Sequence, residues 1–234
     1  MNAVNTVVTR GLVVEYPSDR GPVRALVHAG LVVEGGSSLA VMGPSGCGKS
    51  TLLGLLAGLA VPTSGTVTIG DTPLSELPER RRLEFRRRAL GMIYQADNLL
   101  PHLTVEENVG LQLAIVRGSN GGGRPADDPH RLLARLGLDG LAARFPDQLS
   151  GGQRQRVAVA RAIVHRPSVI LADEPTGSLD DENARAVIEL ISEVQREIGA
   201  TLILVTHDPA IAAYADRVER LATPSHGAGP IHAG

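Results

Sequence analysis

Gly43-Pro44-Ser45-Gly46-Cys47-Gly48-Lys49-Ser50 is the stretch that decides the fold of this chain. Its spacing matches the phosphate-loop pattern G-x-x-x-x-G-K-[ST]. An apolar run from Ser38 to Met42 precedes it, and Thr51 to Leu56 continue it with residues typical of a helix. The order strand, loop, helix is the context in which this pattern binds phosphate, so we predict a nucleotide site here.

The loop supplies both hydrogen-bond donors and positive charge. Backbone N–H groups from Ser45 to Ser50 would wrap a phosphate at the start of the helix, where the peptide dipoles sum to about half a positive charge. Lys49, the only lysine of the chain, would reach the β- and γ-phosphates, and the Ser50 hydroxyl would ligate Mg²⁺. We also expect the thiol of Cys47 to react with a maleimide and to be protected by ATP. The predicted nucleotide-binding positions of the loop are Gly43, Pro44, Ser45, Gly46, Cys47, Gly48, Lys49, Ser50 and Thr51.

Two carboxylates end a second apolar run, Val169-Ile170-Leu171-Ala172-Asp173-Glu174. Ligands of parallel sheets bind at the carboxyl ends of the strands. We therefore predict that Asp173 holds Mg²⁺ through water and that Glu174 orients the attacking water. The alternative is an acidic surface pair at the end of a strand.

The remaining patterns predict an α/β fold. Val169 to Ala172 and Leu202 to Val205 are apolar throughout, as expected for parallel strands buried on both faces. Apolar residues between them recur at helical spacing, which closes a β-α-β unit in a mostly parallel, doubly wound sheet. Val7 to Tyr16 and Thr66 to Ile69 alternate like edge strands of an antiparallel sheet.

Other segments carry little strand signal. Residues 79–147 predict a mostly helical insert, with a surface loop at 118–129, and residues 223–234 predict a frayed tail. The chain has no internal repeat, so we expect one domain over residues 1–222.

Composition excludes several classes of protein. The 234 residues carry a net charge of −2 and only 2% aromatic residues, which argues against a nucleic-acid partner. The longest apolar stretch falls short of the ~20 residues that span a bilayer, and the first residues do not read as a signal peptide. A lone cysteine favours the reducing cytoplasm.

Between the two phosphate-site motifs lies Leu149-Ser150-Gly151-Gly152-Gln153. Ser150 is predicted to cap a helix whose inner face carries Val157, Ala160, Ile163 and Val164. The glycines leave backbone N–H groups open to an anion, so this is a second anion-binding helix start. Taken alone, it is only a capped helix.

The three motifs in this order, followed by His207, resemble the ATP-binding-cassette (ABC) ATPases from about Tyr16 to about Leu221. The resemblance implies a P-loop NTPase core with a mostly parallel sheet, a side antiparallel β-subdomain and a helical subdomain at about 79–165. It implies a homodimer in which Ser150, Gly151, Gly152 and Gln153 close on ATP held by the other copy. It also implies that Gln95 senses the γ-phosphate and Mg²⁺, that His207 contacts the γ-phosphate, and that Asp180 lies at the dimer interface.

The ring expected to stack on adenine is Tyr16, which could equally be a plain strand residue. Similarly, the arginines at 80–82 and 86–88 form either a solvated helix face or a contact with anionic lipid.

Residues 97–109 and Thr176 to Asp180 are similar to the ABC subfamily of lipoprotein-releasing, macrolide-efflux and cell-division ATPases. The chain lacks an Asp-Gly turn after Asp216 to begin a last strand. The resemblance implies an ATPase that drives a separate transmembrane permease exporting or extracting amphipathic cargo, held at the inner face of the cell membrane. Two alternatives remain: a mechanical device that regulates cell-wall enzymes through a membrane protein, and a soluble protein of DNA repair or translation.

Overall fold

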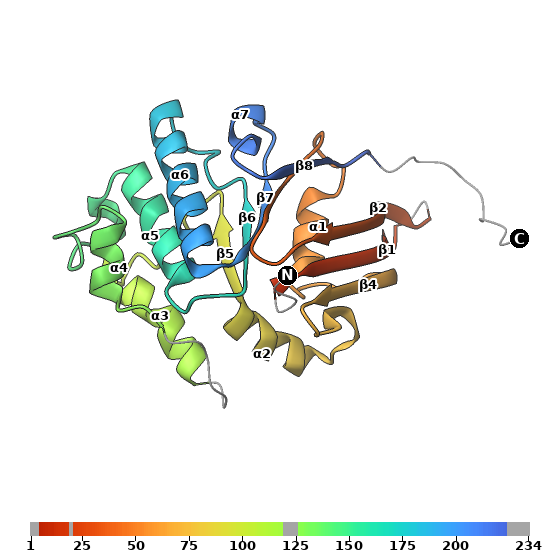
Figure 1. The fold of residues 1–234 in the computed structure, drawn as a ribbon, viewed down its shortest axis with the longest axis horizontal. Helices are drawn as coiled ribbons and strands as arrows, with labels where there is room; N and C mark the ends of the chain where they lie inside the picture. The colour runs from red at the N-terminus through yellow and green to blue at the C-terminus, as the bar shows by residue number, and fades with distance from the viewer. Residues whose placement is uncertain (1–4, 19–20, 119–125, 224–234) are drawn as a thin grey trace, which may run out of the picture.

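The computed structural model describes residues 5–18, 21–118 and 126–223, and it contains two sheets and a helical layer (Figure 1). The predicted tail at 223–234 lies outside the described residues apart from Thr223. The predicted surface loop at 118–129 falls largely in the gap between them. Within the described ranges, no helix is long and apolar enough to cross a membrane.

A parallel five-stranded sheet forms the centre of the molecule, as predicted. Its order is β5-β6-β7-β3-β8, and all neighbouring strands are parallel, so each connection crosses over the sheet. β5, β6 and β7 follow one another in the chain, whereas β3 lies between β7 and β8. The strands are β3 (Ser38–Met42), β5 (Leu90–Tyr94), β6 (Val169–Asp173), β7 (Thr201–Val205) and β8 (Arg217–Arg220). The short run at β5 joins the edge of this sheet, so the mostly helical range also contributes one strand.

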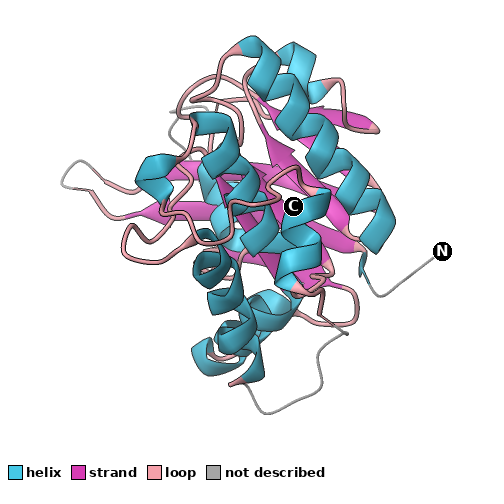
Figure 2. Cartoon of the chain, turned by 90° about the vertical axis from the view of Figure 1, so that its left-hand side faces the viewer, coloured by secondary structure: helices cyan, strands magenta, loops and turns pink. Residues whose placement is uncertain are grey.

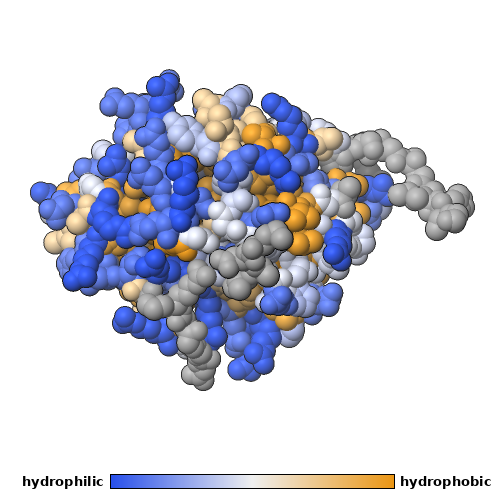
Figure 3. All heavy atoms as spheres, in the orientation of Figure 1, coloured by the Kyte–Doolittle hydropathy of each residue, from blue (hydrophilic) through white to orange (hydrophobic). Residues whose placement is uncertain are grey.

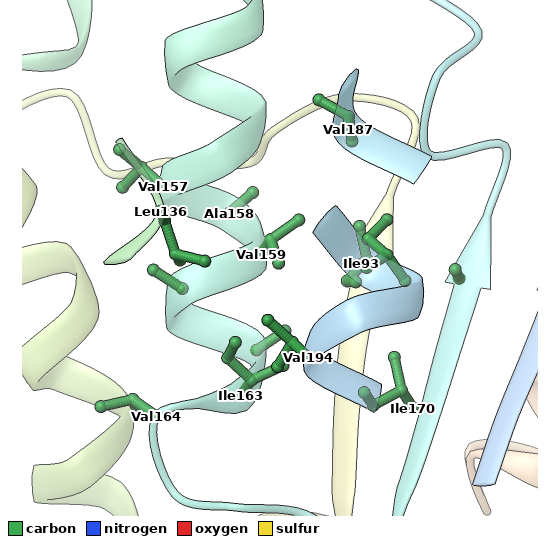
Figure 4. Packing of buried hydrophobic residues seen from close by; sticks show 14 of the residues in the cluster. Ile93, Leu136, Val157, Ala158, Val159, Ile163, Val164, Ile170, Val187 and Val194 are labelled. Carbon is green, nitrogen blue, oxygen red and sulfur yellow. The ribbon is translucent and has the colours of Figure 1, made fainter. Parts of the chain in front are cut away.

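Both faces of this sheet are covered, which explains its continuous apolar strands. Ile170 and Leu202 point into a core shared with the helices, whereas Leu171 and Ile203 point into a second core. The helical face is formed by α5 (Gly151–Ile163) and α6 (Asp181–Ile198), whose buried side chains interdigitate over β5 and β6 (Figure 4). The other face is covered by α1 (Lys49–Leu56) and the antiparallel sheet.

The antiparallel sheet has the order β2-β1-β4, with β1 (Val7–Tyr16), β2 (Val23–Val33) and β4 (Ser64–Ile69). The edge position predicted for Thr66 to Ile69 is confirmed, but that for Val7 to Tyr16 is wrong, because β1 pairs on both sides. Alternation reports that one face is buried and says nothing about how many neighbours a strand has.

The remaining helices are α2 (Glu79–Ala89), α3 (Val105–Arg117) and α4 (Pro129–Arg135), and the short α7 (Pro209–Ala212) precedes β8. Of these, α2 packs against β5 and α3, and α3 and α4 pack against α5. Figure 2 shows the helices and the strands of the molecule from this side. Thr104 caps α3 in a capping box with Glu107, so the local sequence sets the start of this helix.

The last strand forms without an Asp-Gly turn. The Asp216 carboxylate accepts hydrogen bonds from the backbone N–H and the hydroxyl of Ser38, both at 2.8 Å, and the Ser38 hydroxyl accepts one from the Asp216 N–H. This reciprocal pair ties the start of β8 to the start of β3 and replaces the turn.

Candidate nucleotide-binding and hydrolysis site

The phosphate loop joins β3 to α1 in the predicted order, and its glycines adopt backbone angles that other residues rarely reach. The φ angles of Gly43, Gly46 and Gly48 are 156°, 79° and 98°. A Cβ at Gly48 would lie 2.6 Å from the carbonyl oxygen of Ala25, so the loop also packs too tightly there for a side chain. At Gly46 a Cβ would meet nothing within 4 Å, which leaves one side of the loop open to a ligand.

Lys49 holds its ammonium at the mouth of this loop. Its Nζ donates hydrogen bonds to the carbonyl oxygens of Gly43 at 2.8 Å and Pro44 at 2.9 Å. The positive charge therefore sits beside the start of α1, where a nucleotide phosphate would receive both the lysine and the helix N–H groups.

The prediction for the Cys47 side chain is wrong. Its residue is fully buried and belongs to the core under the antiparallel sheet. A Cβ at Gly43 would lie only 2.6 Å from the Cys47 Sγ, so the thiol fills the inner side of the loop and points away from the phosphate position. The sequence motif fixes the turn, but it does not report which way its variable positions face.

Asp173 lies at the carboxyl end of β6, next to the phosphate loop. Its carboxyl is half-buried beside Ser50 and Lys49 of the loop. Burial and then the nearby Glu174 carboxylate raise its pKa, while Ser50 and Lys49 oppose that rise. A desolvated carboxylate beside a hydroxyl and a second carboxylate is a donor set that fits a hard divalent cation.

Glu174 and His207 meet at the ends of two neighbouring strands. The His207 Nδ1 lies 2.9 Å from the Glu174 Oε1, and the Glu174 N–H donates to the carbonyl of Val205 at 2.9 Å. Glu174 has a φ of 47°, a left-handed conformation that costs a non-glycine residue about 1–3 kcal/mol. In this conformation the Glu174 carboxylate lies against the histidine.

Gln95 follows β5 and lies against the turn after Glu174. A Cβ at Gly177 would be 3.0 Å from the Gln95 Nε2, and the Ser178 hydroxyl donates to the Gln95 carbonyl at 3.3 Å. The structure thus brings Gln95 to Gly177 and Ser178, although the two segments are over 80 residues apart in sequence.

The predicted cap of α5 is confirmed. The Ser150 hydroxyl accepts from the Gln153 N–H at 3.2 Å, and the Gln153 amide oxygen accepts from the Ser150 N–H at 2.9 Å. Gly152 lies against Asn183 of α6, whose Oδ1 would be 2.5 Å from an added Cβ. Asp180 caps α6 and accepts hydrogen bonds from this same Asn183, so Asp180 and the α5 start share one neighbour.

Sequence reasoning missed the side chains that hold the turn after Gln95. Arg154 pairs with Asp97 at 3.0 Å, Gln155 donates to the Tyr94 carbonyl at 3.0 Å, and Arg161 donates to the carbonyls of Asp97 and Asn98. All three donors belong to α5, which the quoted motif begins, but their polarity alone does not identify the groups that they bind.

The predicted site residues fall into two groups. The phosphate loop, Asp173, Glu174 and His207 lie together at the carboxyl ends of adjacent strands. Ser150 begins a helix on the opposite face of the sheet from α1 (Figure 1). Tyr16 ends β1 with 51% of its residue surface exposed, and no described contact links its ring to the phosphate loop.

Comparison with known proteins agrees with this geometry. Residues 26–177 match the ABC transporter family. The chain is 49% identical over 206 residues to the lipoprotein-releasing system ATP-binding protein LolD of Bordetella pertussis, covering 85% of this chain and 86% of that protein. It is 41% identical over 198 residues to an uncharacterised ABC transporter ATP-binding protein of Mycobacterium tuberculosis, covering 85% of this chain and 79% of that one.

Solved structures extend the agreement to three dimensions. A dimeric ATP-binding cassette in a post-hydrolysis state bound to ADP and Pi superposes with a TM-score of 0.80 at 34% identity, covering 92% of this chain and 94% of that chain. The fold, the phosphate loop and the paired Glu174 and His207 thus occur in a chain whose relatives bind nucleotide. This protein belongs to the ABC transporter family and is one of its ATP-hydrolysing, nucleotide-binding subunits.

Proposed function

We propose that this ATPase closes as a homodimer around two ATP molecules and drives a separate permease that extracts lipid-anchored, amphipathic cargo from a membrane. The observation that carries the proposal is the position of the α5 start. It is a capped, glycine-rich helix start on the opposite face of the sheet from the phosphate loop of the same chain. A second copy arranged head to tail would supply this helix start to the phosphates.

The residues at the strand ends have distinct tasks in hydrolysis. Lys49 and the loop N–H groups bind the phosphates, and Ser50, Asp173 and Gln95 would hold Mg²⁺, which neutralises charge on the phosphate oxygens. Glu174 accepts a proton from the attacking water. His207 positions the Glu174 carboxylate and donates to the γ-phosphate in the closed state.

Closure in trans gives the α5 start its role. The first turn of α5 contains no carboxylate that would repel an anion. The exposed Ser150 and the N–H groups of Gly151 and Gly152 would therefore receive the phosphates of the other copy. Asp180 at the neighbouring helix start would lie across the same interface. The dimeric state of the superposed cassette supports this arrangement.

A hollow beside β5 is the proposed seat of the permease. It encloses about 310 Å³ between α2, β5, α3 and α5, and Leu83, Arg86, Gln112, Arg161 and His165 contribute to its lining. Arg161 also holds the turn after Gln95, so a segment bound there would be coupled to the nucleotide site. Identity of 42–49% to lipoprotein-releasing ATPases supports a lipid-anchored cargo and a position at the inner face of the membrane.

Glu174→Gln tests the proposal. We expect hydrolysis to fall by about 10²–10⁴-fold, the usual contribution of a positioned base, while ATP still binds. Light scattering in ATP and Mg²⁺ should then report an accumulated dimer. A monomer that binds ATP without associating would refute closure around nucleotide. A deletion strain tests the cargo. If this strain loses a regulated cell-wall enzyme activity but does not retain lipid-anchored proteins in the membrane, extraction is refuted and the mechanical role is favoured.

A further inference from the structure

Positive charge is concentrated on α2. The helix has six arginines and two glutamates, a charge of +4 in a chain whose net charge is −2. Hydrophilic side chains gather along the lower edge of the molecule, where α2 lies (Figures 1 and 3). Solvation alone does not explain why a protein of negative net charge concentrates four positive charges on one helix.

The arginines of α2 divide into two sets. Arg82 and Arg86 both pair with Glu79, at 2.6 and 3.0 Å, and Arg86 also donates to the carbonyl of Gly58 at 2.6 Å. Their side chains are only 12% and 19% exposed. Arg86 fastens the helix to the turn after α1, whereas Arg82 pairs within the helix. The alternative of a solvated helix face therefore does not hold for this inner set.

The other four arginines form what we call the outer face: Arg80 and Arg81, which are exposed, and Arg87 and Arg88, which are half-buried. Their spacing of i, i+1, i+7 and i+8 places them on one side of the helix, two turns apart. Arg81 makes a 3.4 Å contact with Glu84, and its side chain remains 70% exposed. Within the described ranges, no carboxylate pairs with Arg80, Arg87 or Arg88.

The outer face lies next to the proposed permease seat. Arg87 and Leu83 line that hollow. A second hollow of about 380 Å³ is lined by Leu77, Arg81, Glu84, Phe85 and Arg88. If the first hollow receives the permease, α2 stands at the side of the ATPase nearest the bilayer. This step rests on the proposed function.

We propose that the outer face of α2 binds the anionic phospholipid headgroups of the membrane that holds the permease. A guanidinium matches phosphate oxygens with two parallel hydrogen bonds, and it loses less hydration than an ammonium. Each arginine near an anionic surface strengthens binding by roughly fivefold, and salt screens the effect. Four of them supply a weak contact that orients the ATPase under its permease without holding it to the membrane alone.

Vesicle flotation of the full chain without permease tests this. Arg80→Gln/Arg81→Gln should partition about 30-fold more weakly than wild type to phosphatidylcholine vesicles containing 30% phosphatidylglycerol, since two charges are lost. The matched control is Arg10→Gln/Arg220→Gln, which removes two exposed arginines from β1 and β8 and should float like wild type. Pure phosphatidylcholine vesicles, or 0.5 M salt, should abolish flotation of all three proteins.

Equal flotation of the two double variants would overturn the proposal, as would binding to pure phosphatidylcholine. Binding of wild type to the soluble polyanion heparin as tightly as to the anionic vesicles would also overturn it, because the face would then recognise anions in general. Basal ATP hydrolysis and the dimerisation of Glu174→Gln do not involve these arginines. A failed flotation therefore leaves the proposed function intact. If instead Glu174→Gln fails to dimerise, the flotation result still decides whether α2 binds anionic lipid.

Discussion

The imidazole Nδ1 of His207 lies 2.9 Å from the Oε1 of Glu174, although the two residues are 33 positions apart. The parallel register explains this contact. Asp173 is paired with Val205, so the residues that follow β6 and β7 emerge side by side at the same edge of the sheet. The adjacent phosphate loop follows β3, which pairs with β7.

His207→Ala should remove the group that holds the Glu174 carboxylate in place. We expect hydrolysis to fall by about 10²-fold or more, with ATP affinity nearly unchanged, because the phosphate loop supplies most of the binding. Single-turnover hydrolysis and titration with a fluorescent nucleotide separate the two effects. His130→Ala, on the exposed surface of α4, is the control and should leave both unchanged. Equal loss of affinity and rate would contradict the positioning role.

Cys47 should be unreactive in the folded protein, with or without ATP. Its side chain is fully buried in the core, so a maleimide reaches the thiol only when the domain opens. Intact mass should show little labelling in native buffer and one complete addition in denaturant, which also serves as the control. Rapid native labelling that ATP prevents would mean that the thiol faces the phosphates after all.

The local patterns predicted β3, β6, β7, α6 and the cap of α5 because each depends on neighbouring residues. Turn glycines at 43, 46 and 48 and the apolar runs need no information about distant parts of the chain. The central position of β1 and the burial of Cys47 could not be predicted, since both depend on which elements pack together. The Asp216 and Ser38 pair belongs to the same class, because 178 positions separate its members.

The candidate site was predictable to a similar extent. The motifs name Lys49, Asp173 and Glu174 because phosphate and metal chemistry restrict the residue types at those positions. Asn183, which lies against Gly152, carries no such signal, since an asparagine in a helix has many uses. Its role appears only when α5 and α6 are placed side by side.

Asp173→Asn should stabilise the nucleotide-free fold while it abolishes hydrolysis. Burial and Glu174 raise the pKa of Asp173, so the folded state holds the ionised carboxylate less well than the unfolded state does. This destabilisation grows as pH rises through the carboxyl range and is fully present at pH 7. Each kcal/mol relieved should raise Tm by about 2–4 °C in a chain of this size.

Thermal unfolding at pH 7 without nucleotide or Mg²⁺ measures that shift. Asp147→Asn, at an exposed position, is the control and should leave Tm unchanged. A Tm lowered by Asp173→Asn would show that the favourable effects of Ser50 and Lys49 outweigh the cost of the buried charge.

His165 should make the fold sensitive to acid. Burial lowers its pKa to about 4, against an ordinary value of 6.5, and its Nε2 lies 3.1 Å from the Leu90 carbonyl. Below pH 6.5 the unfolded chain gains a proton that the folded chain does not accept until about pH 4. Stability is therefore full above pH 6.5 and falls as pH drops, by about 2 kcal/mol at pH 5.

Urea unfolding at pH 7.5 and pH 5.0 measures this loss. His165→Gln keeps a donor for the Leu90 carbonyl and removes the titrating ring, so it should lose about 2 kcal/mol less than wild type between the two pH values. His102→Gln, at an exposed position, should behave like wild type. An unchanged acid dependence in His165→Gln would rule out this histidine as its source.

Mixing two inactive variants tests closure in trans most directly. Lys49→Ala damages the phosphate loop, and Ser150→Arg blocks the α5 start by bulk while leaving the phosphate loop of its own chain intact. In a mixed dimer both lesions fall in one composite site, and the second site combines the intact loop of one copy with the intact helix start of the other. We predict that each variant alone is inactive and that mixing restores ATP hydrolysis. If the mixture stays as inactive as its components, although Ser150→Arg binds ATP like wild type, the α5 start does not act across a dimer interface.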